Sequence, residues 1–240
     1  MNQTRHASTV ACETQARQYL VLVRHGESFA NKALALSGCG LYYASSGSDL
    51  EIGLTDNGHA QSSEVGQLIS RLFPAHRPLK KIWTSQFLRT RQTAHNIRQC
   101  LHYDAEHTSD DRLAKRDYGM FWNLTYRGVK EMHPEEWERF QIVGPLRYRP
   151  PEGENYPDVF DRVDEFIEEE IDPSSGHHLI VTHSVVVLSF ERTIEGLADH
   201  EVVKRYEEIA LPNAHIKIYA RNNLDEEWQP ISIEQALSEL

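Results

Sequence analysis

The chain has 240 residues and a formal net charge of −11, with 40% hydrophobic and 25% charged residues. These values are typical of a globular protein with its own core, and they exclude collagen-like, low-complexity and wholly disordered chains. No apolar run is long enough to cross a bilayer, and so acidic a chain is poorly suited to nucleic-acid binding, although a small basic pocket for an anion is compatible with it.

The cysteines and the N-terminal sequence indicate the cellular compartment in which the protein is expected. The three cysteines, Cys12, Cys39 and Cys100, cannot all pair and have no metal-binding spacing, which favours a reduced, cytoplasmic protein. Residues 1–18 are polar and lack the apolar segment of a secretory signal peptide, so we expect a flexible N-terminal tail there. With no linker and no internal repeat in the sequence, residues 19–240 are expected to form a single domain.

Short apolar runs alternate with amphipathic segments along the rest of the chain. Strands are expected at residues 19–23, 81–84, 178–182 and 214–221. Helices are expected at residues 55–73, 87–100, 158–171, 185–196 and 231–240. This alternation predicts an α/β fold with a mainly parallel sheet.

Two segments are less regular. Glycine and serine recur between residues 33 and 53, which we interpret as a long loop with room for one short helical turn. Residues 112–155 are interrupted by prolines and glycines, and the sequence from His133 to Trp137 suggests the start of a helix. Residues 173–176 are typical of a turn.

Histidine and arginine residues follow the predicted strands. Arg24 and His25 come directly after the first strand, His183 follows the strand at 178–182, and Arg89 lies near the start of a helix. The carboxyl ends of parallel strands share one edge of a sheet, where ligands bind. A histidine nitrogen can attack phosphorus, and arginines match phosphoryl oxygens. These residues indicate a phosphoryl site that needs no metal, because cationic side chains supply the charge.

The sequence Arg24-His25-Gly26-Glu27-Ser28, followed by Asn31, resembles the signature of the histidine phosphatase superfamily, also called the phosphoglycerate mutase-like family. Further similar segments follow in the family's order: Leu54-Thr55-x-x-Gly58-x-x-Gln61, Thr84-Ser85-x-x-x-Arg89-Thr90-x-x-Thr93-Ala94, Arg116-Asp117-Tyr118-Gly119 with Asn123-Leu124-Thr125, Pro151-x-Gly153-Glu154-Asn155, Thr182-His183 and Pro212-Asn213. The resemblance covers residues 19–219. It implies the phosphoglycerate mutase-like fold, in which a mainly parallel central sheet is flanked by helices on both faces.

The resemblance also implies roles for the candidate catalytic residues. His25 is expected to be the nucleophile that becomes phosphohistidine, and His183 to donate a hydrogen bond to the phosphoryl group. Arg24 and Arg89 are expected to bind phosphoryl oxygens, and Asn31 to lie at the edge of the pocket as a substrate-binding residue.

Two residues depart from the family's pattern at the expected site. Lys115 stands where the branch that this chain most resembles has a glutamate that acts as general acid and base. A cationic amine is a poor proton donor near neutral pH, so Lys115 is expected to bind phosphate, and Asp117 or Glu154 could supply the acid. Ser184 replaces a glycine and is expected either to bind ligand or to cap the following helix.

The sequence therefore predicts a metal-independent phosphatase, without a cofactor, that hydrolyses a small phosphomonoester through phosphohistidine. The insertion of the cofactor-dependent mutases is absent between Thr125 and Pro151, which favours a phosphatase. Two alternatives stay open: a phosphoglycerate mutase-type phosphotransferase, and a catalytically impaired phosphate-binding protein that lost its acid at Lys115. We expect no nucleic-acid or membrane partner, and the oligomeric state, a homodimer included, stays open. Aromatic candidates for the substrate pocket are Tyr42, Tyr43, Phe121 and Trp122, and a core role for Phe121 and Trp122 stays open as well.

Overall fold

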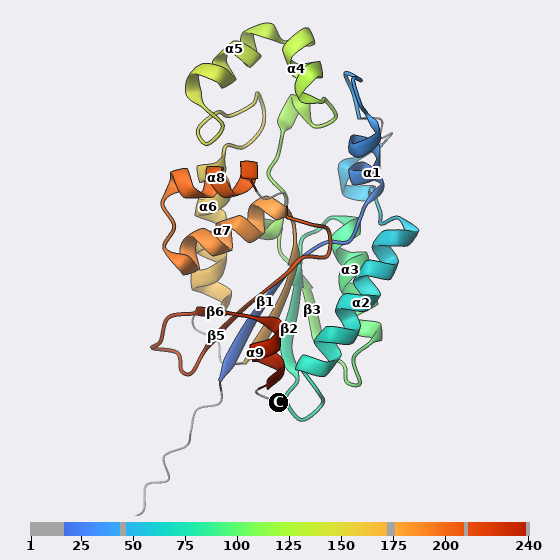
Figure 1. Ribbon diagram of the computed structural model, residues 1–240, viewed down its shortest axis with the longest axis vertical. Helices are drawn as coiled ribbons and strands as arrows, with labels where there is room; N and C mark the ends of the chain where they lie inside the picture. The colour runs from blue at the N-terminus through green and yellow to red at the C-terminus, as the bar shows by residue number, and fades with distance from the viewer. Residues whose placement is uncertain (1–16, 44–46, 172–175, 209–210, 239–240) are drawn as a thin grey trace, which may run out of the picture.

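The computed structural model describes residues 17–43, 47–171, 176–208 and 211–238 (Figure 1). The expected tail at residues 1–18 and the expected turn at residues 173–176 lie almost entirely outside these ranges. None of the helices within them combines the length and the hydropathy needed to span a membrane.

A six-stranded sheet forms the centre of the fold, in the order β3-β2-β4-β1-β5-β6. Strands β1 to β4 are mutually parallel, whereas β5 is antiparallel to β1, and β6 to β5. The predicted mainly parallel sheet is thus confirmed. The strands are β1 Gln18–Arg24, β2 Leu79–Thr84, β3 Glu106–Ser109, β4 His177–Thr182, β5 Ile216–Arg221 and β6 Gln229–Ile231.

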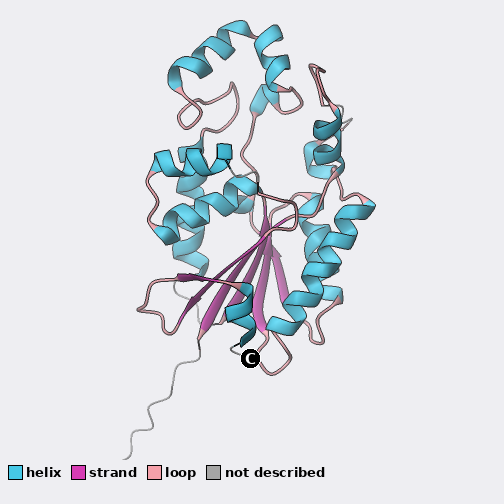
Figure 2. Ribbon diagram, viewed as in Figure 1, coloured by secondary structure: helices cyan, strands magenta, loops and turns pink. Residues whose placement is uncertain are grey.

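Helices cover both faces of this sheet (Figures 1 and 2). One layer contains α2 (Asp56–Leu72), α3 (Leu88–Gln99) and α9 (Ile233–Ser238), and the other contains α6 (Tyr156–Phe166) and α7 (Ser184–Glu195). Successive strand side chains point to opposite faces, so alternate residues of β1 enter the two cores. A strand buried on both faces reads as a continuous apolar run, which is why the sequence predicted β1.

The expectation of a long loop at residues 33–53 was wrong at its start. Helix α1 spans Phe29–Leu36, and its first turn is closed by a capping box between Ser28 and Asn31. A short 3₁₀ turn, η1, spans Asp49–Glu51 and corresponds to the one short helical turn that was expected within this loop.

The irregular middle of the chain folds into a helical cap. Helix α4 (Tyr126–Met132) is followed by α5 (Pro134–Val143), which begins after His133 as predicted. We call residues 126–143 the cap. In Figure 1 the cap lies apart from the sheet, beyond the end that also bears α1.

Four further elements differ from the predictions. Helix α6 ends at Phe166 and continues as a π-helical turn, η4 (Ile167–Ile171), where one long helix was expected. Helix α8 (Asp199–Glu208) and the short strands β3 and β6 were not predicted. Both strands lack an apolar run, because β3 is the polar sequence EHTS and β6 has only three residues.

Candidate active site

His25 and His183 meet at the carboxyl edge of the parallel strands. Their strands β1 and β4 are neighbours, and the backbone N–H of His25 donates to the carbonyl oxygen of Thr182 at 2.9 Å. The two imidazole rings are 5.1 Å apart between centroids, at an interplanar angle of 66°. Both residues are 4% exposed. The structure therefore brings together the two histidines that the sequence placed at one sheet edge.

The tautomer of His25 is fixed by its neighbour. His25 Nδ1 lies 2.7 Å from the carbonyl oxygen of Gly26, which can only accept, so Nδ1 carries the ring proton. Burial, and next the charge of Arg89, hold the pKa of His25 well below its usual range. The ring is therefore neutral near pH 7, and Nε2 holds the lone pair that a nucleophile needs.

Close backbone contact explains two glycines of the motifs. A Cβ atom at Gly26 would lie 2.4 Å from the carbonyl oxygen of Gly58, and one at Gly58 would lie 2.0 Å from that of Glu27. The Glu27 carboxylate also accepts a hydrogen bond from the hydroxyl of Thr55, which caps α2. The start of α2 thus packs directly against the turn that carries His25.

The second histidine is held by the segment that contains Arg89. His183 Nε2 lies 2.9 Å from Ser85 Oγ, and its ring packs against Phe87 at 5.0 Å. When Ser85 donates this bond, the ring proton is on Nδ1, where it can be donated to a phosphoryl oxygen. Burial lowers the pKa of His183 well below its usual range. The sequence did not single out Ser85, although the residue lies within the motif that contains Arg89.

Cationic side chains surround the two histidines. Arg24, Arg89 and Lys115 line one cavity with His25 and His183. Arg24 Nη1 donates to the carbonyl oxygen of Leu211, while its Nε is buried without a hydrogen-bond partner among the described residues. Burial lowers the pKa of Arg24 and of Arg89, because their charge is poorly solvated. A bound anion would offset these buried positive charges and so stabilise the site.

One carboxylate lies among these cations, and sequence reasoning missed it. Asp49 Oδ1 lies 3.0 Å from Arg89 Nη1, which also donates to the Asp49 carbonyl oxygen at 2.9 Å. The other carboxylate oxygen forms an ion pair with Lys115 Nζ. Asp49 provides the only carboxylate among the described side chains that line the cavity. It lies in the segment interpreted as a loop, where no motif marked it.

Asn31 and Ser184 line the same cavity. Asn31 Oδ1 accepts hydrogen bonds from the backbone N–H of Ser28 at 3.1 Å and from Asn213 Nδ2 at 3.0 Å. Asn213 Nδ2 also donates to the carbonyl oxygen of His25 at 3.2 Å. Ser184 is the first residue of α7, whose first turn has no side-chain cap. Uncapped N–H groups at a helix N-terminus favour bound anions, so Ser184 is well placed beside a phosphoryl group.

The two acids proposed from the sequence lie elsewhere. Glu154 Oε1 lies 3.0 Å from Arg162 Nε, and its Oε2 accepts from the backbone N–H of Asp117 at 2.9 Å. The Asp117 side chain accepts from the backbone of Gly119. Neither acid is among the described side chains that line the cavity. The structure therefore does not bring Glu154 or Asp117 to the histidines.

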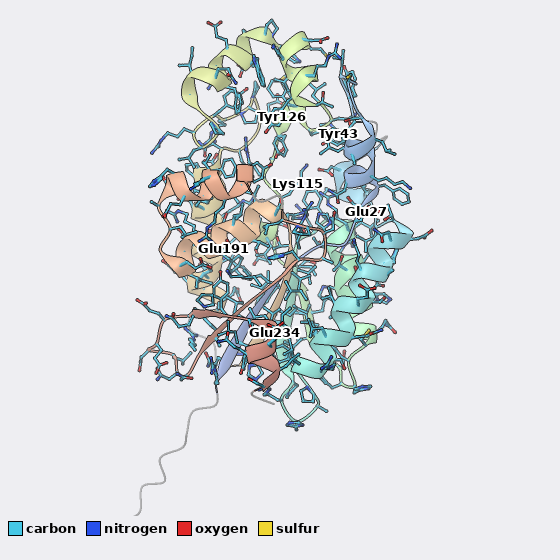
Figure 3. All side chains as sticks on the ribbon, viewed as in Figure 1. Glu27, Tyr43, Lys115, Tyr126, Glu191 and Glu234 are labelled. Atoms are coloured by element: carbon cyan, nitrogen blue, oxygen red, sulfur yellow. The ribbon has the colours of Figure 1, made fainter. Side chains whose placement is uncertain are left out.

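The cavity has a volume of 380 Å³ and extends from the sheet edge to the cap. Figure 3 shows Lys115 between the sheet and Tyr126 of the cap, with Tyr43 nearby. Of the four aromatic candidates, Tyr43, Phe121 and Trp122 line the cavity, and Phe121 is also buried, whereas Tyr42 is 50% exposed and does not line it. Further rings come from the cap and the segment after it: Tyr126, Trp137, Phe140 and Tyr148. Within the described ranges, no group of three or more His, Cys, Asp or Glu residues is arranged to hold a metal ion.

Comparisons with known proteins identify sequence relatives of this chain. A probable phosphoglycerate mutase, GpmB, from Citrobacter koseri is 30% identical over 179 residues, which cover 73% of this chain and 74% of the relative. The 6-phosphofructo-2-kinase/fructose-2,6-bisphosphatase of Aquarana catesbeiana is 31% identical over 168 residues, which cover 70% of this chain and 31% of that protein.

Solved structures share the fold. The alpha-ribazole phosphatase of Shigella flexneri matches with a TM-score of 0.68 at 20% identity, over 90% of this chain and 96% of that one. Mycobacterial glucosyl-3-phosphoglycerate phosphatase matches with a TM-score of 0.64 at 18% identity, over 89% and 97%. The family model of the histidine phosphatase superfamily (branch 1) matches residues 20–229. The chain therefore belongs to branch 1 of the histidine phosphatase superfamily.

Proposed function

We propose that this protein is a metal-independent phosphatase that hydrolyses a phosphomonoester through a phosphohistidine at His25. The observation that carries the proposal is the state of His25, a buried, neutral imidazole whose proton is held on Nδ1 by the Gly26 carbonyl. Its Nε2 lone pair is available in a cavity that Arg24, Arg89 and Lys115 also line. A neutral nucleophile beside cations is suited to attack on an anionic phosphoryl group.

The reaction has two displacements at phosphorus. In the first, His25 Nε2 forms a bond to phosphorus, the ester P–O bond breaks, and the leaving oxygen takes a proton. In the second, water attacks the phosphohistidine, the P–N bond breaks, and inorganic phosphate leaves with His25 neutral again. Arg24, Arg89 and Lys115 offset the charge on the transferring group, and His183 donates to one of its oxygens.

The shape of the cavity favours an alcohol with an aromatic or bulky apolar group. The cations gather at the sheet edge, whereas the cap contributes Tyr126, Val129, Trp137 and Phe140. The Trp137 and Phe140 rings are 5.5 Å apart, and such aromatic surfaces favour flat apolar groups. The cap contributes no cationic side chain to the described lining, and a further cation of the lining, Arg116, donates to the carbonyl oxygen of Glu154 and lies over the Tyr118 and Tyr156 rings. The apolar character of the cap supports a phosphatase over the phosphoglycerate mutase alternative.

The test is phosphate release in the presence of a chelator. Native protein and His25→Ala are assayed with aryl phosphates, sugar phosphates and phosphoglycerate. We expect the native protein to release phosphate, fastest from aryl phosphates, and His25→Ala to release none above background. Isomerisation of phosphoglycerate without phosphate release would instead support the mutase. Phosphate binding without any turnover would support the phosphate-binding alternative.

A further inference from the structure

We propose that Asp49 is the proton donor and acceptor of this site, supplied by the segment between α1 and α2 because position 115 holds a lysine. The inference rests on the proposed function and assigns its missing acid. Lys115 Nζ is paired with Asp49, and Glu154 is paired with Arg162 outside the cavity lining. Asp49 is therefore the candidate carboxyl group that can reach a substrate among the described residues.

The backbone of Asp49 has hydrogen bonds of its own in addition to those of its carboxylate. Arg89 Nη1 donates to the Asp49 carbonyl oxygen at 2.9 Å, and the N–H of Ile52 donates to the same oxygen at 3.3 Å. Ser48 caps the 3₁₀ turn, and its hydroxyl accepts from the N–H of Leu50 at 3.3 Å. Asp49 can therefore exchange the partners of its carboxylate while its main chain stays in place.

The partners of the carboxylate are the cations that a substrate needs. The charges of Arg89 and Lys115 contribute to the low pKa of both His25 and His183, so both cations lie within electrostatic reach of the two rings. Both contacts of Arg89 with Asp49 use Nη1, and a guanidinium has five N–H donors. A phosphoryl group bound between the histidines and these cations is therefore next to the Asp49 carboxyl group.

Substrate binding changes the charge around the Asp49 carboxylate and favours its protonation. In the structure the carboxylate offsets the charge of Arg89 and Lys115. A phosphate dianion that binds the same cations takes over this role, and two adjacent negative groups are unfavourable. The Asp49 carboxyl group then takes up one proton from solvent.

That proton completes both displacements. As His25 Nε2 bonds to phosphorus and the ester P–O bond breaks, the Asp49 carboxyl group gives its proton to the leaving oxygen, which departs as the alcohol. The Asp49 carboxylate then accepts a proton from the water that attacks phosphorus, and the P–N bond breaks toward Nε2. Phosphate leaves, and the Asp49 carboxyl group returns its proton to solvent as it pairs again with Arg89 and Lys115, so no redox partner is required.

The experiment compares two leaving groups with Asp49→Asn. The leaving nitrophenolate of 4-nitrophenyl phosphate needs no proton, whereas the alkoxide of benzyl phosphate does. The pre-steady-state rate of alcohol release measures the first displacement. The amount of phosphohistidine found after quenching during turnover reports on the second displacement, which removes it. With Asp49→Asn we expect the nitrophenol burst to stay within a few-fold of native and benzyl alcohol release to fall about 100-fold or more. Phosphohistidine is expected to accumulate in the nitrophenyl reaction.

The matched control is Glu51→Gln, an exposed carboxylate on the same 3₁₀ turn, which should behave like the native protein with both substrates. An equal loss with both leaving groups, or faster turnover because an obstructing anion is gone, overturns the role of Asp49. If Asp49→Asn does not fold, Asp49→Glu tests the same claim, since it keeps the carboxyl group and should keep benzyl phosphate turnover. A native protein that forms no phosphohistidine from either substrate overturns the proposed function itself.

Discussion

Lys115 and Asp49 form an ion pair inside the cavity that contains both histidines. The family pattern has one carboxylate at position 115, whereas this chain has a cation there and a carboxylate on a different segment. Relative to that pattern, this chain keeps one carboxylate at the site, carries it on another segment and adds one positive charge. This relationship leads to a direct prediction about exchanging the two charges.

Moving the carboxylate back to position 115 should restore the alkyl phosphatase activity that Asp49→Asn loses. Lys115→Glu alone should lower kcat/KM for benzyl phosphate by about 10-fold or more, because two carboxylates then face each other and one cation is lost. The double variant Asp49→Asn with Lys115→Glu should be more active than either single variant. A double-mutant cycle on kcat/KM measures the coupling, expected at about 1–3 kcal/mol. Additive losses would show that the two side chains act independently.

The protonation state of His25 can be measured directly. Burial and the nearby charge of Arg89 lower its pKa, so His25 should remain neutral as the pH falls through about 6.5, where an exposed histidine becomes protonated. Nitrogen-15 NMR of the imidazoles should show the Nδ1–H tautomer of His25 from pH 8 to below 6. A short histidine-containing peptide, measured under the same conditions, provides the titrating reference. A His25 signal that titrates together with this reference contradicts the account.

The cap should determine which alcohols are accepted. Trp137→Ala removes a ring from the cavity and should lower kcat/KM for benzyl phosphate about 10-fold while leaving ethyl phosphate nearly unchanged. Ile142→Ala is the control, because Ile142 lies on the same helix and is 78% exposed. Steady-state kinetics with the two substrates measures the difference. Equal losses for both alcohols would mean that Trp137 supports the fold rather than the substrate.

Two buried histidines at the start of β4 should make the fold sensitive to acid. Burial lowers the pKa of His177 and of His178 to about 4, and His178 Nδ1 accepts a hydrogen bond from Trp83 Nε1 at 3.2 Å. Between about pH 6.5 and 4 the unfolded chain binds more protons than the folded one, so the free energy of unfolding falls as the pH falls. Each histidine contributes up to about 1.4 kcal/mol per pH unit.

Urea unfolding at several pH values tests this dependence. His178→Gln keeps an acceptor for Trp83 and removes one titrating group, so its free energy of unfolding should depend less on pH. An unchanged pH dependence in that variant would assign the acid sensitivity to other groups.

Much of the fold was predictable because its strongest signals are local. Strand β1 has a continuous apolar run since both of its faces are buried, and α2 carries a Thr55 cap and an apolar stripe. Helix α1 was missed because the residues that begin it, Ser28 and Asn31, were interpreted as part of the site motif. They also form the capping box at the start of the helix. Strand β3 is a short polar edge strand held by pairing with β2, and no periodic pattern reveals such a strand.

The site was predictable only in part. His25 and His183 follow strands, so the rule that parallel strands end at one edge placed them together. Asp49 reaches the same cavity from a connection whose path depends on distant contacts, including the two hydrogen bonds that Arg89 Nη1 makes to it. The sequence marks such a residue neither by spacing nor by periodicity. Glu154 was expected near the histidines for want of the same kind of information. Its partner Arg162 lies on α6, and the sequence does not show that these two side chains pair.

The most direct test of the central claim is to trap the covalent intermediate. Native protein is quenched with alkali during turnover of 4-nitrophenyl phosphate, and the peptides are analysed by mass spectrometry. We predict that one phosphoryl group is found on the histidine at position 25, that acid removes it, and that His183→Ala lowers its amount without moving it. Turnover that leaves no phosphoryl group on His25 at any time point, or places it on another residue, would contradict the account.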